Sequence, residues 1–168
     1  MITGDVVRLD KTGRVAGVEP APRADASSPR FFTHKAGART YVFPSDVQEL
    51  VGERLDAELF NVTELARHGL GRDGAVPVIV SAAKPSAAPA LADELAKLGV
   101  EVTAELGAVP ARAGQADAAA EAGPAPSWRL IEAAAEPAAA VDKVWLDRVS
   151  QVEPLAGAGG PAPDYKTP

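Results

Sequence analysis

The chain has 168 residues, of which 46% are hydrophobic and 5% aromatic, so we expect one ordinary domain or two very small ones with a mainly aliphatic core. Seventeen basic against 23 acidic residues give a net charge of −6, which disfavours nucleic acid and anionic membranes as partners because phosphate binding needs a basic face. The absence of cysteine excludes disulfides and a cysteine nucleophile, and no apolar run approaches the roughly 18 to 20 residues of a membrane span.

The beginning of the chain predicts two β-hairpins and a helix. Short apolar segments flank turn residues within residues 5–19 and again within residues 31–43. Ser45, followed three residues later by Gln48, matches a capping box and predicts a helix that Gly52 ends. We therefore expect a small β-hairpin-rich subdomain.

The remainder of the chain predicts alternating strands and helices. The apolar run at residues 76–80 is typical of a buried strand, and residues 100–106 alternate as in a half-buried one. The other expected elements are a helix at residues 90–98, a short strand at 109–113, a helix at 128–135 capped by Ser127, and a strand at 141–146. Residues 114–126 are interpreted as an Ala/Gly/Pro linker, and Trp128 and Trp145 as core residues between helix and sheet.

This order of elements predicts an α+β fold. Strand, helix, strand, strand, helix and strand in succession favour a ferredoxin-like antiparallel α/β sandwich, with two helices on one face of the sheet. We therefore divide the chain into a β-rich subdomain (residues 1–65), a glycine-rich linker (66–75), the ferredoxin-like domain (76–147) and an extended Pro/Gly-rich tail (148–168).

The sequence predicts no catalytic or metal site. His34 is expected in a strand and His68 in a loop, and neither has a suitably spaced acidic or histidine partner for a metal. No serine lies in a G-x-S-x-G turn, and the glycine-rich segments do not join a strand to a helix as phosphate-binding loops do. We expect neither an enzyme nor a cofactor.

Three segments resemble the N-terminal prosequence of secreted bacterial subtilisin-like serine proteases. They are Ile2-Thr3-Gly4-Asp5-Val6-Val7 with the turn Lys11-Thr12-Gly13-Arg14-Val15, then Leu59-Phe60-Asn61-Val62-Thr63-Glu64-Leu65, and finally Asp142-Lys143-Val144-Trp145-Leu146-Asp147. Their order and spacing match too, and the resemblance extends from residue 2 to about residue 147. The tail departs from it, because the chain ends without a protease domain.

The resemblance implies a function for each part of the second half. It implies that the sheet lies against two helices of a protease domain, that the tail occupies the substrate cleft, and that the prodomain acts as folding chaperone and then as inhibitor. It also implies that the chain is secreted, although no signal peptide is present in this sequence. Asp147 matches the position of a carboxylate that caps a protease helix.

The tail contains a candidate cleft-binding segment, Val152-Glu153-Pro154-Leu155. Leu155 and Val152 place bulky apolar side chains where a subtilisin-type cleft has its first and fourth pockets, so we predict cleavage after Leu155. Counting from Asp147 with the spacing usual in the family instead places the cleavage near Glu153, and the segment is alternatively a plain linker.

Two other functions remain open. The chain is alternatively a free-standing inhibitor of a subtilisin-like protease, or a binding module without any link to proteases. In all three cases we expect a protein partner, and neither nucleic acid nor a membrane.

Overall fold

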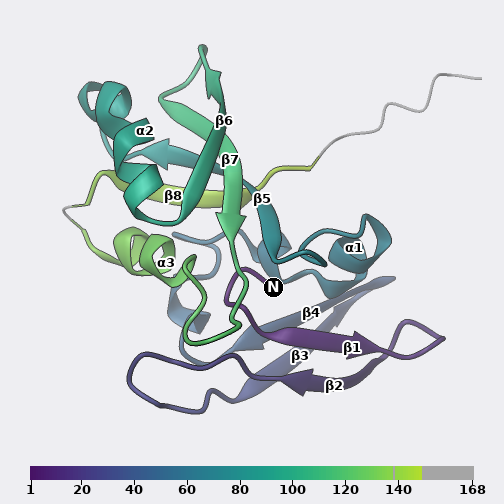
Figure 1. Cartoon of the computed structure of the whole chain (residues 1–168). Helices are drawn as coiled ribbons and strands as arrows, with labels where there is room; N and C mark the ends of the chain where they lie inside the picture. Colours follow the sequence, from purple (N-terminus) through teal and green to yellow (C-terminus); the bar gives the residue numbers. More distant parts are fainter. Residues whose placement is uncertain (138, 149–168) are drawn as a thin grey trace, which may run out of the picture.

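The computed structural model describes residues 1–137 and 139–148 (Figure 1). It is a mixed α+β fold with antiparallel sheets and few helices. The strands and helices are β1 (Val6–Leu9), β2 (Val15–Glu19), β3 (Phe31–Ala36), β4 (Arg39–Pro44), α1 (Val62–Arg67), β5 (Ala75–Ala82), α2 (Ala88–Lys97), β6 (Val100–Leu106), β7 (Ala111–Asp117), α3 (Trp128–Ala135) and β8 (Val141–Leu146). Short 3-10 turns lie at Gln48–Leu50, Ala57–Phe60 and Pro85–Ala87.

The two predicted hairpins are confirmed: β1 pairs with β2, and β3 pairs with β4, both antiparallel. The first turn is stabilised by its own sequence. The Asp10 carboxylate accepts hydrogen bonds from the backbone N–H groups of Thr12 (2.7 Å) and Arg14 (3.0 Å). Gly13 has a φ of 77°, a conformation that glycine adopts without a steric penalty.

The predicted helix at Ser45 is wrong. The chain forms only the 3-10 turn Gln48–Leu50, and no side chain caps it. The Ser45 hydroxyl instead accepts a hydrogen bond from the Arg30 N–H (3.0 Å), and the Ser45 N–H donates to the Arg30 carbonyl (2.8 Å). Ser45 can either cap a helix or close the open end of the second hairpin. In the structure its hydrogen bonds close the hairpin, so no helix is capped.

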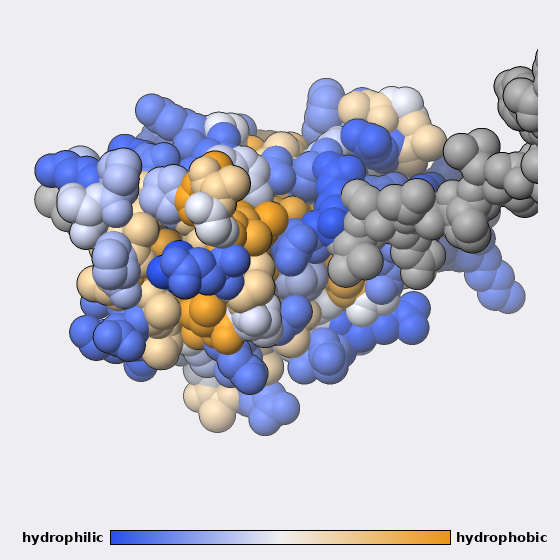
Figure 2. Space-filling view, turned by 90° about the horizontal axis from the view of Figure 1, so that it is seen from above, coloured by the Kyte–Doolittle hydropathy of each residue, from blue (hydrophilic) through white to orange (hydrophobic). Residues whose placement is uncertain are grey.

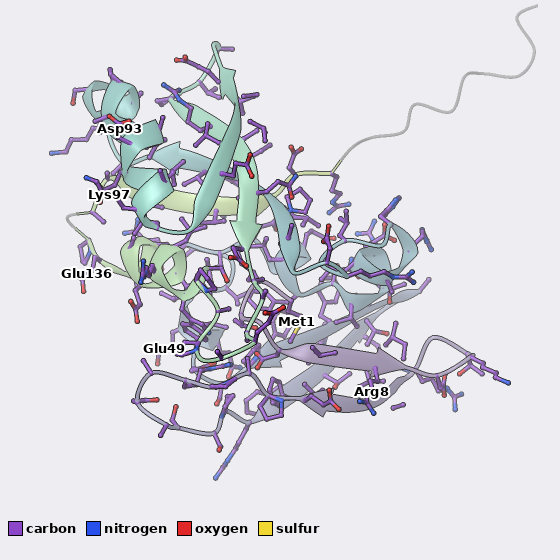
Figure 3. All side chains as sticks on the ribbon, in the orientation of Figure 1. Met1, Arg8, Glu49, Asp93, Lys97 and Glu136 are labelled. Carbon is purple, nitrogen blue, oxygen red and sulfur yellow. The ribbon has the colours of Figure 1, made fainter. Side chains whose placement is uncertain are left out.

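The second half forms a four-stranded antiparallel sheet with the strand order β6-β7-β5-β8. The predicted succession of strands and helices is confirmed. In Figure 1, α2 and α3 lie on the same side of this sheet. Asp93 and Lys97 point outward from α2, away from the sheet (Figure 3), while Leu91 and Leu95 are buried against it.

The interpretation of residues 114–126 as a linker is wrong in its first part, because β7 continues to Asp117. Its small residues are required by the close approach of β6: a Cβ on Gly114 would lie 2.6 Å from the Glu101 carbonyl oxygen. Low strand propensity was therefore a sign of tight packing and not of an irregular segment.

The two halves of the chain share one hydrophobic core. Ile2, Leu59 and Phe60 from the first half belong to the same buried cluster as Val78 and Leu130 from the second. The predicted linker at residues 66–75 contains the last two residues of α1, a turn-rich loop and the first residue of β5.

Candidate functional site

The two residues that follow β8 are held by contacts with other parts of the molecule. Asp147, the predicted protease-contact residue, follows β8 directly and is half-buried, and its N–H donates to the Pro77 carbonyl (3.0 Å). The guanidinium of Arg148 forms an ion pair with Glu58, with 2.7 Å between Nη2 and Oε2. The predicted cleft residues Val152, Glu153, Pro154 and Leu155 lie outside the described residues.

Glu58 is the centre of a polar cluster that the sequence did not reveal. The Tyr41 hydroxyl donates to Oε1 (2.8 Å), and the Asn61 side-chain amide donates to Oε2 (2.8 Å). Arg39 contributes a second cation 3.8 Å from Oε1. The Glu58 side chain is only 13% exposed, so two groups from β4, the neighbouring Asn61 and the distant Arg148 converge on one nearly buried carboxylate.

The surroundings of Glu58 set its protonation. Burial by itself raises the pKa of the Glu58 carboxyl, but the hydrogen bonds from Asn61 and Tyr41 and the charges of Arg148 and Arg39 outweigh it. The pKa therefore lies below its ordinary value of 4.5, and the carboxylate is charged at neutral pH.

This pKa shift predicts how stability depends on pH. A carboxyl group whose folded-state pKa is lowered contributes stability above its unfolded pKa, and the contribution is lost as the pH falls through the folded value. We expect the melting temperature of Glu58→Gln to lie below that of the wild type at pH 7, and the difference to shrink as the pH falls below about 4. Melting curves followed by circular dichroism at several pH values measure it, and a difference that is constant with pH would contradict the assignment.

The side of the four-stranded sheet that faces away from α2 and α3 is a second candidate surface, here called the open sheet face. Ile79 in β5 lies opposite Trp145 in β8 and Ala113 in β7. Ile79 and Trp145 are both half-buried. The prediction that Trp145 fills the core between helix and sheet is wrong, because Val144 and Leu146 take the inward positions and alternation turns Trp145 to the other face.

Lys143 accompanies Trp145 on β8. Its ammonium lies 5.6 Å from the Trp145 ring and donates to the Gly52 carbonyl (2.6 Å). A further exposed apolar residue, Val109, follows β6 in the turn to β7. This turn lies at the end of the molecule seen in Figure 2, where hydrophobic residues gather between hydrophilic ones.

The motif Ile2-Thr3-Gly4-Asp5 is explained by a buried ion cluster. Asp5 is fully buried and binds Arg23 through two hydrogen bonds of 3.0 and 2.9 Å. The Thr3 hydroxyl also donates to Asp5 (2.6 Å), and a Cβ on Gly4 would lie 2.9 Å from the Ala125 Cβ. The role of the motif is therefore structural.

The two histidines lie in different surroundings. His34 is exposed in β3, with its ring 6.4 Å from that of Tyr41. His68 follows the last residue of α1, and its Nε2 lies 3.3 Å from Glu64, so the prediction that no acidic residue is suitably placed beside this histidine is wrong. Within residues 1–137 and 139–148, no group of three or more His, Asp or Glu side chains is arranged to hold a metal ion.

The same part of the chain contains no helix that is both long and apolar enough to cross a bilayer. In comparisons with known proteins, no protein-family model, no curated protein and no solved structure matches the chain.

Proposed function

We propose that the chain is the prodomain of a secreted subtilisin-like serine protease, acting as folding chaperone and autoinhibitor. The observation that carries the proposal is that a segment resembling the family also has the position in the sheet that the resemblance implies. The segment Asp142–Asp147, which resembles the family's last prodomain strand, contains most of β8 and the residue after it. β8 lies at one edge of the sheet, and the other three strands precede it in the chain.

The finer fold assignment belongs to this proposal. We propose a ferredoxin-like sandwich, which is supported by the order β6-β7-β5-β8 and by the positions of α2 between β5 and β6 and of α3 between β7 and β8 in the chain. Such a sandwich covers one face of its sheet with its own helices, which leaves the other face available to a partner.

The open sheet face has the chemistry of a docking surface. Trp145 and Ile79 offer apolar contact area that is partly exposed, and tryptophan is among the residues that contribute most to binding at interfaces. A flat sheet face held by a packed core is preorganised, so little conformational entropy is lost when a partner binds. We propose that the two helices of the protease domain lie against this face.

The position of Asp147 fits a contact with a protease helix. Its backbone is fixed by the hydrogen bond to Pro77, and its carboxylate forms no ion pair with any of the described residues. A carboxylate near a helix N-terminus is stabilised by the unpaired N–H groups and by the positive end of the helix dipole. We propose that Asp147 caps a helix of the protease in this way.

The remaining parts of the proposal concern the tail and the setting. Val152, Glu153, Pro154 and Leu155 occupy the substrate cleft, with cleavage after Leu155. The chain itself performs no catalysis and needs no cofactor, and its partner is a secreted protease domain.

The proposal is tested by titrating the full chain into a subtilisin-type protease with a chromogenic peptide substrate. We expect inhibition at or below micromolar concentration, and a loss of about tenfold or more when the chain ends at residue 148, because the cleft then loses its occupant. Mass spectrometry of the incubated mixture should find cleavage after Leu155. The absence of inhibition at micromolar excess would overturn the proposed function, and cleavage at Glu153 would move the scissile bond only.

A further inference from the structure

A segment of the first half runs alongside β8 and ends beside Arg148. Leu55 forms a parallel bridge with Val144. The Asp56 N–H donates to the Val144 carbonyl (2.8 Å), and the Val144 N–H donates to the Arg54 carbonyl (2.9 Å). Because the two segments run in the same direction, residues shortly after Leu55 come to lie near residues shortly after Val144.

Glu58, three residues after Leu55, lies beside Arg148, four residues after Val144. It lies in the 3-10 turn Ala57–Phe60, whose first N–H groups are capped by the Asp56 carboxylate (3.2 Å to the Glu58 N–H). Its own carboxylate also accepts hydrogen bonds from Tyr41 and Asn61, which do not involve Arg148. Glu58 is thus a fixed anion, and Arg148 is the side chain that binds to it.

The ion pair of Glu58 and Arg148 is less exposed to water than a surface ion pair. Glu58 is 13% exposed and Arg148 is 43% exposed, so the carboxylate has little water with which to replace the guanidinium. Arg148 is also the second residue after β8, where the chain has left the hydrogen bonds of the sheet.

We propose that Glu58 is a positioning residue that holds the chain at Arg148, where it leaves β8. The consequence for inhibition rests on the proposed function: a tail that starts in the right direction loses less entropy when it enters a cleft. The anchoring itself is independent of that function.

The chain offers a matched control pair on the same strand. Arg54 pairs with Asp142 (3.0 Å), which also joins the first half to β8, but near the beginning of the strand. Arg54→Gln removes a similar ion pair without touching the end of β8.

The first experiment measures hydrogen exchange of the Asp147 amide by NMR in the full chain. We expect Arg148→Gln and Glu58→Gln each to raise its exchange rate about five- to tenfold, the effect of losing one charged hydrogen bond. The double variant should show about the same increase, because both changes remove one interaction. Arg148→Lys should recover part of the protection, and Arg54→Gln should change it less than about twofold. An unchanged rate in Arg148→Gln, or an equal increase in Arg54→Gln, would overturn the anchoring.

The second experiment measures inhibition of a subtilisin-type protease. Arg148→Gln should weaken inhibition about three- to tenfold with little change in melting temperature, and Arg54→Gln should not. If the wild type inhibits and Arg148→Gln inhibits equally well, the tail is not directed by Glu58, while the proposed function stands. If the wild type does not inhibit, the proposed function fails, and the exchange experiment still decides the anchoring.

Discussion

Replacing Arg23 by methionine is expected to destabilise the folded chain by about 3–5 kcal/mol, the cost of leaving a buried charge without its partner. Arg23 is 4% exposed and bridges two carboxylates, those of Asp5 and Asp46, the latter 2.7 Å from its Nε. Asp5 is fully buried, and after the substitution its carboxylate keeps hydrogen bonds from the N–H of Ala21 and the hydroxyl of Thr3 but loses both bonds from Arg23.

The loss should extend beyond the ion pair. The guanidinium of Arg23 lies over the Trp128 ring, 4.6 Å from its centre, and the Trp128 indole N–H donates to the Thr3 carbonyl (3.0 Å). Arg23 therefore connects the N-terminal segment to α3, and its removal is expected to loosen both.

Urea denaturation followed by tryptophan fluorescence measures the effect. The control is Arg8→Met, because Arg8 and Glu19 form an ion pair with both side chains more than half exposed, which is expected to contribute at most about 1 kcal/mol. Asp5→Asn combined with Arg23→Met should cost less than the sum of the single changes, since no unpaired buried charge remains. Equal stability of Arg23→Met and Arg8→Met would contradict the buried cluster.

Patterns that act over a few residues were sufficient to predict much of the fold. The alternation in residues 100–106 and the apolar run at 76–80 correspond to β6 and β5 because inward and outward positions repeat along a strand. Turn residues such as Asp10 hydrogen-bond to their own neighbours, so their effect is visible locally.

Two of the wrong predictions, both about serines, share one physical cause, a distant partner. Ser127 was expected to cap α3, yet its side chain makes no capping hydrogen bond and its hydroxyl donates to the Ile2 carbonyl. Ser45 was likewise diverted to Arg30. A serine has the same local signature in either role, and only the tertiary structure decides which acceptor or donor lies within reach.

The candidate site was predicted only in part for the same reason. Asp147 was singled out from a motif, but Glu58 and Arg148 are 90 positions apart and meet through the parallel bridge of Leu55 with Val144. No sequence periodicity around Leu55 or Val144 predicts that bridge. The predicted motif at residues 59–65 does lie next to Glu58. Within it, Asn61 caps α1 and donates a hydrogen bond to the Glu58 carboxylate.

Truncating Trp145 to alanine is expected to weaken inhibition of a subtilisin-type protease about 30- to 1000-fold, because a central aromatic residue at an interface commonly contributes about 2–4 kcal/mol. The expectation follows from the proposed function and from the location of Trp145 on the open sheet face, opposite Ile79. Because the side chain is only partly buried and lies outside the main core cluster, the fold should survive its loss.

The matched control is Val109→Ala, which removes an apolar side chain that is 53% exposed but lies in the β6–β7 turn. Inhibition constants and circular dichroism melting curves for the two variants, together with Ile79→Ala, separate docking from stability. A large loss of inhibition in Trp145→Ala and Ile79→Ala, with melting temperatures near that of the wild type and no loss in Val109→Ala, supports docking through this face. If Trp145→Ala inhibits as well as the wild type, the protease does not lie against the open sheet face, and any inhibition that remains must come from the tail alone, because the cleft is the other surface through which a prodomain binds its protease.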